Sequence, residues 1–91
     1  VSRETVTAMA CGAREKFSAT LGLAITGIAG PGGGTPEKPV GLTYIGLATP
    51  ERVIVEKHIW QGERLQNKEQ SAEAALQLLY RYLSEFKNQN S

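Results

Sequence analysis

The chain has 91 residues, with ten Lys or Arg, nine Asp or Glu and a formal net charge of +1. This length suits one domain or part of one, and so small a charge gives no reason to expect a nucleic acid or a membrane as partner. A hydrophobic content of 41% indicates a globular chain, and no apolar run approaches the ~18 residues of a membrane span.

The single cysteine, Cys11, excludes an internal disulfide and fits a reducing compartment, so we expect a cytoplasmic location. The chain begins at Val1 without a methionine, and a sheet this small would have exposed edges. We therefore expect residues 1–91 to be part of a longer protein, with residues 87–91 as a frayed tail. The alternative is a trimmed or mature product that is complete in itself.

A first helix is predicted from about Arg3 to Phe17, with Ser2 as its N-cap. Its apolar positions recur at helical spacing: Val6, Met9, Ala10, Ala13 and Phe17. Gly12 inside it costs about 1 kcal/mol relative to Ala, which leads us to expect close packing there.

Three strands follow. The apolar run Leu21–Ile25 fits an interior strand covered on both faces, and Thr26 stands at its carboxyl end. A second strand is expected over Val40–Ala48. The third, Val53–Trp60, should pair antiparallel with the second because the connection is short, and its charges place it near an edge.

A long last helix is predicted from about Arg64 to Phe86. Its expected apolar stripe comprises Leu65, Ala72, Ala75, Leu76, Leu79, Leu83 and Phe86. The element order predicts a mixed α/β layer structure that contains an antiparallel hairpin.

Between the first two strands lies a stretch rich in glycine and proline, from Thr26 to Gly41. Glycines let a ligand approach the backbone, and consecutive amides can form an anion-binding nest, so one interpretation is a pocket wall for a phosphate or carboxylate. The other is a flexible crossover loop. Thr35-Pro36 follows the last glycine of the run, which excludes a Walker A loop, and the β-rich continuation excludes the dinucleotide fingerprint.

Four side chains outside the glycines are candidates for binding: Thr26, Thr35, Lys38 and Arg64. Lys38 and Arg64 could each meet a phosphate, although surface cations are the simpler interpretation. His58 has no visible acidic partner and is interpreted as a surface residue. No cluster has metal-ligand spacing, and the sequence offers no convincing nucleophile and base pair.

The stretch Thr26–Gly41 resembles the signature of the CinA C-terminal domain family, which includes nicotinamide-nucleotide amidases. Gly62-Glu63-Arg64 is similar to the family's Gly-Asp-Arg turn, and Ala72 to Leu76 to its last helix. The resemblance implies a three-layer α/β/α sandwich with a mixed sheet, often a homo-oligomer. It also implies deamidation of nicotinamide mononucleotide to nicotinate mononucleotide and ammonia, without a metal or other cofactor.

The resemblance also assigns roles. Thr26 would support catalysis, and Arg64 would orient the substrate through its phosphate. The pocket loop would be formed by Gly27, Gly30, Gly32, Gly33, Gly34 and Thr35. The family's Glu-Ser-Cys-Thr-Gly-Gly motif and its partner lysine, which precede the region matched here, do not occur in this sequence.

Three positions depart from the family pattern: Glu63 replaces Asp, and Asn67 and Lys68 stand where a hydrophobic residue and an arginine are common. These departures concern the contacts around Arg64. Because the family's serine motif and its partner lysine are absent, we expect this chain alone to lack amidase activity. One alternative is a non-catalytic module with a nucleotide-binding or regulatory role. Another is a structural subunit that completes its sheet with a further chain.

Overall fold

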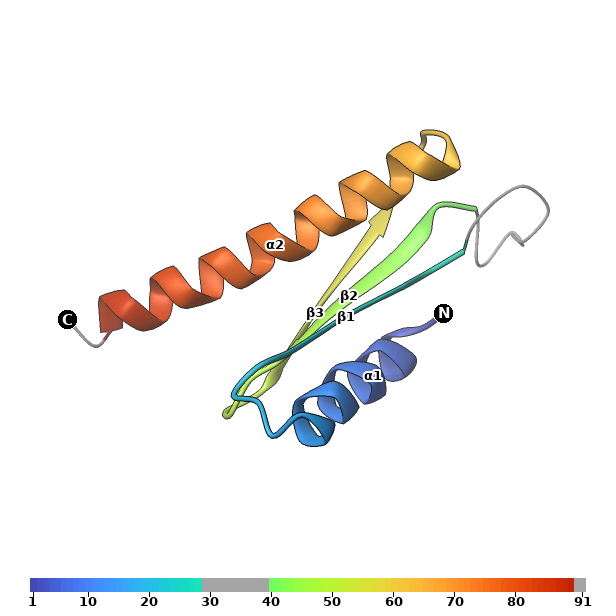
Figure 1. Cartoon of the computed structure of the whole chain (residues 1–91). Helices are drawn as coiled ribbons and strands as arrows, with labels where there is room; N and C mark the ends of the chain where they lie inside the picture. The colour runs from blue at the N-terminus through green and yellow to red at the C-terminus, as the bar shows by residue number, and fades with distance from the viewer. Residues whose placement is uncertain (29–39, 90–91) are drawn as a thin grey trace.

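The computed structural model describes residues 1–28 and 40–89, which form two helices and three strands (Figure 1). In chain order these are α1 (Arg3–Lys16), β1 (Gly22–Gly27), β2 (Leu42–Ala48), β3 (Val53–Ile59) and α2 (Arg64–Gln89). The predicted order of elements is confirmed, and the bounds differ from the predicted ones by three residues or fewer.

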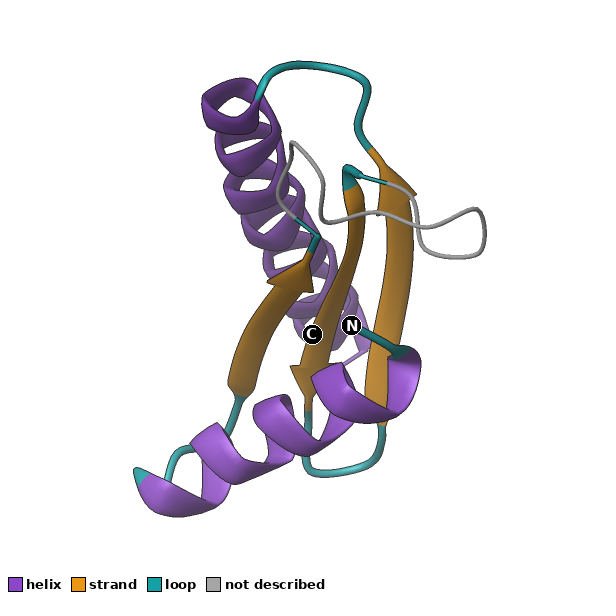
Figure 2. Ribbon diagram, turned by 90° about the vertical axis from the view of Figure 1, so that its right-hand side faces the viewer, coloured by secondary structure: helices purple, strands orange, loops and turns teal. Residues whose placement is uncertain are grey.

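The three strands form one sheet in the order β1-β2-β3. β1 pairs antiparallel with β2, placing Ile25 opposite Ile45, and β2 pairs antiparallel with β3, placing Thr43 opposite His58. α1 covers one face and α2 the other, so the expected three-layer α/β/α arrangement is confirmed (Figures 1 and 2).

Two details of the sheet differ from expectation. Every strand pair in the described residues is antiparallel, so the predicted mixed pairing is not seen there. Among the described strands β1 pairs only with β2, so it lies at the edge of this three-stranded sheet and not in its interior. Its apolar character reflects the helices on its two faces.

The α1 layer begins where the sequence predicts. The Ser2 hydroxyl oxygen accepts a hydrogen bond of 3.0 Å from the Thr5 amide, which caps the helix. Gly22 of β1 lies so close to α1 that a Cβ there would be 2.2 Å from the Ala10 carbonyl oxygen. Gly12, in contrast, has no neighbour within 4 Å of its potential Cβ, so the expectation of close packing at Gly12 is wrong.

β2 separates two apolar clusters by strict alternation of its side chains. On the α1 face, the buried cluster is Val6, Ala10, Ala24 and Ala48. On the α2 face, it is Ile45, Leu47, Ala75 and Leu78. The predicted division of β2 into two faces is confirmed, and β2 forms the centre of both cores.

The buried face of α2 overlaps the predicted stripe only in part, at Ala75 and Leu79. Its inward positions follow Ser71, Ala75 and Leu78, whereas much of the predicted stripe is exposed: Leu65 (68%), Leu76 (60%) and Leu83 (47%). A helix of 26 residues is about 39 Å long, and a seven-residue strand spans only about 23 Å. The helix therefore extends beyond the sheet, as Figure 1 shows.

Among the described residues, no helix is long and apolar enough to cross a membrane.

Candidate functional site

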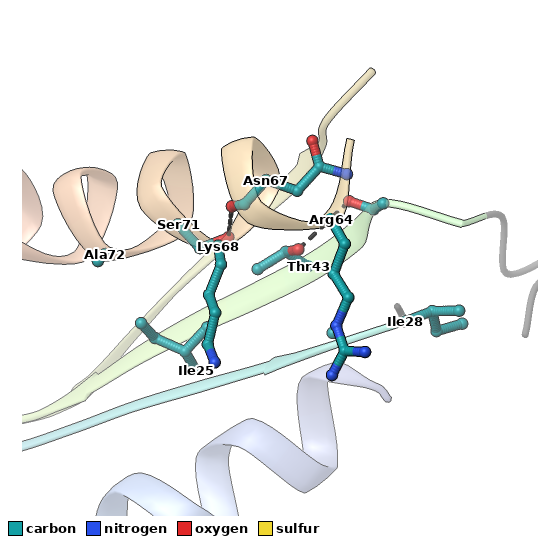
Figure 3. A pocket seen from close by; sticks show the side chains of 10 residues that line it. Ile25, Ile28, Thr43, Arg64, Asn67, Lys68, Ser71 and Ala72 are labelled. Carbon is teal, nitrogen blue, oxygen red and sulfur yellow. Dashed lines mark hydrogen bonds between the residues drawn. The ribbon is translucent and has the colours of Figure 1, made fainter. Parts of the chain in front are cut away.

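A cavity of about 440 Å³ lies between the first turns of α2 and the end of β1 (Figure 3). Its volume is within the usual range for small-molecule sites. The lining combines apolar strand residues with the polar start of the helix. The described lining residues are Ile25, Gly27, Ile28, Gly41, Thr43, Arg64, Asn67, Lys68, Ser71 and Ala72.

The two ends of the glycine-rich stretch meet at this cavity. The Ile28 amide donates to the Leu42 carbonyl, and the Gly41 amide donates to the Ile28 carbonyl, both at 2.9 Å. The Gly41 carbonyl in turn accepts from the Trp60 amide at 3.0 Å. Gly41 has φ +91°, and a Cβ there would lie 2.2 Å from the Trp60 carbonyl oxygen, so only glycine fits. Residues 29–39 between these ends lie outside the described part.

Local hydrogen bonds fix the start of α2. The Glu63 amide donates to the Gln66 side-chain oxygen at 3.2 Å, which is one half of a capping box. This arrangement places Arg64 in the first helical turn. Lys68 follows four residues later and therefore lies on the same side of the helix. Figure 3 shows both long side chains reaching from α2 toward β1.

A buried hydrogen-bond chain attaches this part of α2 to the sheet. The Trp60 indole N–H donates to the Ser71 hydroxyl at 2.7 Å, and that hydroxyl donates to the Asn67 carbonyl oxygen at 2.8 Å. Ser71 is only 6% exposed. The helix turn that carries Arg64 and Lys68 is thus held in place from the β3 side.

The cavity has a positive electrostatic character. Its described lining contains two cations and no carboxylate, and neither Arg64 nor Lys68 forms an ion pair with a described residue. The lining hydroxyls are already engaged: Ser71 as above, and Thr43 by donating to the Gly41 carbonyl at 3.2 Å. The arrangement is suited to binding an anion next to an apolar group, and its described lining lacks a nucleophile paired with a base.

The structure brings together some of the predicted site residues and separates others. Gly27 and Arg64 both line the cavity. Thr26 does not, because successive side chains of β1 alternate between faces. Thr26 lies opposite Tyr44, which packs in the α1-side cluster, whereas Ile25 faces α2. Thr26 therefore faces the α1 side of the sheet and Arg64 the α2 side, and the supporting catalytic role of Thr26 stays a prediction.

The remaining predicted site residues lie outside the described part of the chain: Gly30, Gly32, Gly33, Gly34, Thr35 and Lys38. Their assignment to the pocket stays a prediction.

His58 has an acidic partner that the sequence analysis missed. Its Nε2 lies 3.2 Å from a Glu56 carboxylate oxygen, and its ring stacks on Trp60 with centroids 4.7 Å apart. The other Glu56 oxygen accepts from Arg81 of α2. Partial burial raises the pKa of Glu56, but hydrogen bonds and charges from Arg81 and His58 outweigh it, so this pKa lies below its usual 4.5. The group joins β3 to α2, and none of its three residues lines the cavity.

Sequence reasoning missed Lys68 as a lining cation, treating it only as a departure from a family pattern. Its spacing of four residues from Arg64 on a predicted helix was the available signal. Within the part of the chain that the structure describes, no group of three or more His, Cys, Asp or Glu side chains could hold a metal ion.

Comparison with known proteins places these observations in a family. Residues 1–83 match the model of the CinA C-terminal domain. A CinA-like protein of Desulfotalea psychrophila is 51% identical over 83 residues, which are 91% of this chain and 20% of that protein.

Solved structures of related proteins have a similar fold over the matched residues. A competence/damage inducible protein from Agrobacterium tumefaciens superposes with a TM-score of 0.83 at 36% identity, covering 89% of this chain and 50% of that one. A CinA superfamily protein from Escherichia coli gives a TM-score of 0.84 at 27% identity, covering 90% and 48%. The chain spans about a fifth of the curated relative and about half of these solved chains. Sequence and fold together show that it belongs to the CinA C-terminal domain family.

Proposed function

We propose that this chain forms part of an amidohydrolase that converts nicotinamide mononucleotide to nicotinate mononucleotide and ammonia. In this proposal the chain supplies the phosphate-binding side of the active site. Arg64 contacts the substrate phosphate through its guanidinium, and Lys68 adds a second positive charge. The nucleophile and its base belong to a further segment of the family domain.

The observation that carries the proposal is a pair of cations, neither of which forms an ion pair with a described residue, beside an apolar wall. A mononucleotide offers a doubly charged phosphate and an aromatic ring, and the cavity offers Arg64 and Lys68 next to Ile25 and Ile28. A cation that already faced a carboxylate would gain less from a phosphate, and no described carboxylate competes here.

A second function, binding without turnover, is favoured by the engaged hydroxyls. Because the Thr43 and Ser71 hydroxyls donate to backbone carbonyls, they are poorly placed to act as nucleophiles. A nucleotide-binding or regulatory module would use the same cations and need no catalytic pair.

Calorimetry with two ligands tests the proposed phosphate contact. Nicotinamide mononucleotide should bind to the chain, and nicotinamide riboside, which lacks the phosphate, should bind at least about tenfold more weakly. Equal affinity for the two ligands would contradict a binding contact with the phosphate. Ammonia release then separates the two functions when the complete family domain is assembled: turnover supports the amidase, and binding without turnover supports the module.

The proposal places the reaction in the cytoplasm and gives the chain a small phosphorylated substrate as its ligand. Homo-oligomer formation stays a prediction from the family resemblance.

A further inference from the structure

Trp60 follows the end of β3, and its backbone is fixed to one residue of the cavity wall. Its amide donates to the Gly41 carbonyl at 3.0 Å, and its carbonyl oxygen would lie only 2.2 Å from a Cβ at Gly41. Gly41 lines the cavity, whereas Trp60 is not among the described lining residues. Trp60 is therefore attached to the cavity wall without forming part of it.

The indole ring of Trp60 is held in one orientation by two contacts. The His58 ring stacks on it, with centroids 4.7 Å apart and planes inclined by 7°. The indole N–H donates to the hydroxyl of Ser71, a residue that is only 6% exposed, at 2.7 Å. Because a short buried hydrogen bond has a defined direction, this bond fixes where Ser71 lies relative to the end of β3.

Ser71 passes this constraint to the turn of α2 that carries the two lining cations. Its hydroxyl donates to the Asn67 carbonyl at 2.8 Å, one helical turn earlier in the chain, as Figure 3 shows. Arg64 precedes Asn67 by three residues, and Lys68 follows it directly. Successive helix positions differ by about 100° around the axis, so a rotation of α2 by one position would turn both cations out of the cavity.

Two further polar contacts of α2 lie too far along the helix to fix this turn. Arg81 bonds to Glu56 of β3, and the Tyr82 hydroxyl donates to Glu51, in the turn before β3, at 3.2 Å. Both follow Ser71 by ten residues or more, which is about 15 Å along the helix. Apolar packing between α2 and β2 has no preferred direction of its own. The bond from the indole to the hydroxyl therefore sets the rotation of the cationic end.

We infer that Trp60 is a positioning residue for the anion site. Its indole N–H, acting through Ser71, holds the two lining cations where both meet the ligand phosphate. This role rests on the proposed function, in which Arg64 and Lys68 bind the phosphate of a mononucleotide. It goes beyond that function because it assigns phosphate selectivity to a side chain outside the described cavity lining. A Trp60 with a purely structural role would affect folding stability and leave the selectivity unchanged.

Calorimetry of the intact 91-residue chain with nicotinamide mononucleotide and with nicotinamide riboside tests this role, because the ratio of the two affinities reports the phosphate contact. Trp60→Phe keeps a ring that can stack on His58 but removes the N–H. The ratio should therefore fall about threefold or more, while the affinity for the riboside stays the same. Ser71→Ala should lower the ratio by a similar factor. The double variant should show no further fall, because both changes remove the same hydrogen bond.

Tyr82→Phe is the matched control. It also removes a tertiary hydrogen bond of α2, but one that lies toward the opposite end of the helix from the cavity. Urea unfolding compares the stability losses of the Trp60→Phe and Tyr82→Phe variants, and only Trp60→Phe should lower the affinity ratio. If Trp60→Phe does not fold, Ser71→Ala provides the same comparison.

The possible outcomes separate this role from the proposed function. A wild-type chain that binds both ligands equally would reject the proposed function, and positioning by Trp60 with it. If the wild type prefers the mononucleotide and both Trp60→Phe and Ser71→Ala keep that preference, only the positioning role is rejected. An equal fall in the ratio for Tyr82→Phe would reject it too, because the loss would then follow general destabilisation. Losses that add in the double variant would reject the action of Trp60 through Ser71.

Discussion

Arg64 and Thr26 illustrate how far single residues could be assigned from the sequence. Both were expected at the site, yet they lie on opposite faces of the sheet. The alternation of β1 side chains would have revealed this had it been combined with the face covered by α2, which the sequence does not give. The position of Arg64 at the start of α2 could be predicted, because the Gly62-Glu63-Arg64 turn that precedes the helix is visible in the local sequence.

Replacing Arg64 by alanine should weaken binding of nicotinamide mononucleotide by about 1.5–3 kcal/mol, the usual value of a hydrogen bond to a charged group. Lys68→Ala should cost less, because a lysine meets a phosphate as a point charge. Calorimetry measures both. Arg52→Ala, in the exposed turn between β2 and β3, is the control and should bind normally; equal losses in all three variants would argue against a specific cation pair.

Replacing Gly41 or Gly12 by alanine should change the free energy of unfolding in opposite directions. Gly41→Ala should destabilise the fold by about 2 kcal/mol or more, because φ is +91° and the new Cβ would clash with the Trp60 carbonyl. Gly12→Ala, at an open helix position, should instead stabilise it by up to about 1 kcal/mol. Urea unfolding followed by circular dichroism measures both free energies. A neutral Gly41→Ala variant would show that the turn can relax.

At the scale of elements, the sequence predicted each helix and strand of the described residues but not which side of α2 is buried. α2 carries apolar residues over more than half of its circumference, so periodicity alone allows two stripes. The stripe at Ala75 and Leu78 packs on Ile45 and Leu47. The Trp60–Ser71 hydrogen bond favours this rotation, and such a polar tertiary contact leaves no periodic signal.

The contact between β3 and α2 should make stability depend on pH. Because the pKa of Glu56 is lowered in the folded chain, its carboxylate contributes stability that is fully present above pH 4.5 and is lost as the pH falls through the folded-state pKa. Glu56→Gln should therefore be less stable than the wild type at pH 7, by about 1 kcal/mol or less for a partly exposed pair.

The difference between Glu56→Gln and wild type should shrink below pH 4.5, which urea unfolding at several pH values can follow. Glu69→Gln on the exposed side of α2 serves as the control. A Glu56→Gln deficit that stays constant down to pH 3 would assign the effect to packing and not to charge.

At the scale of the whole molecule, the chain is elongated. Its radius of gyration is 14.0 Å, whereas a compact chain of this length would have about 12 Å. The excess reflects α2, which is longer than the sheet it covers. The sequence indicated the order of layers through periodicity, but the exposed β1 edge depends on strand neighbours that no local pattern encodes.

Turnover should require more of the family domain than this chain contains. Incubated with nicotinamide mononucleotide, the 91-residue chain should release no more ammonia than a protein-free blank, because the family's nucleophile motif is absent from its sequence. The same chain complexed with the unmatched half of a relative should release ammonia, and Arg64→Ala in that complex should reduce kcat/KM by about tenfold or more, since the phosphate contact positions the amide for attack.

Ammonia release by the chain alone would place the catalytic groups within residues 1–91. It would reject the proposal that another segment supplies the nucleophile. A complex that forms but stays inactive would reject the amidase, because binding and turnover are measured separately. Arg52→Ala in the complex is the matched cation control, and its kcat/KM should equal that of the unaltered complex. An equal fall in both variants would mean that Arg64 acts through the net charge of the chain and not through contact with the phosphate.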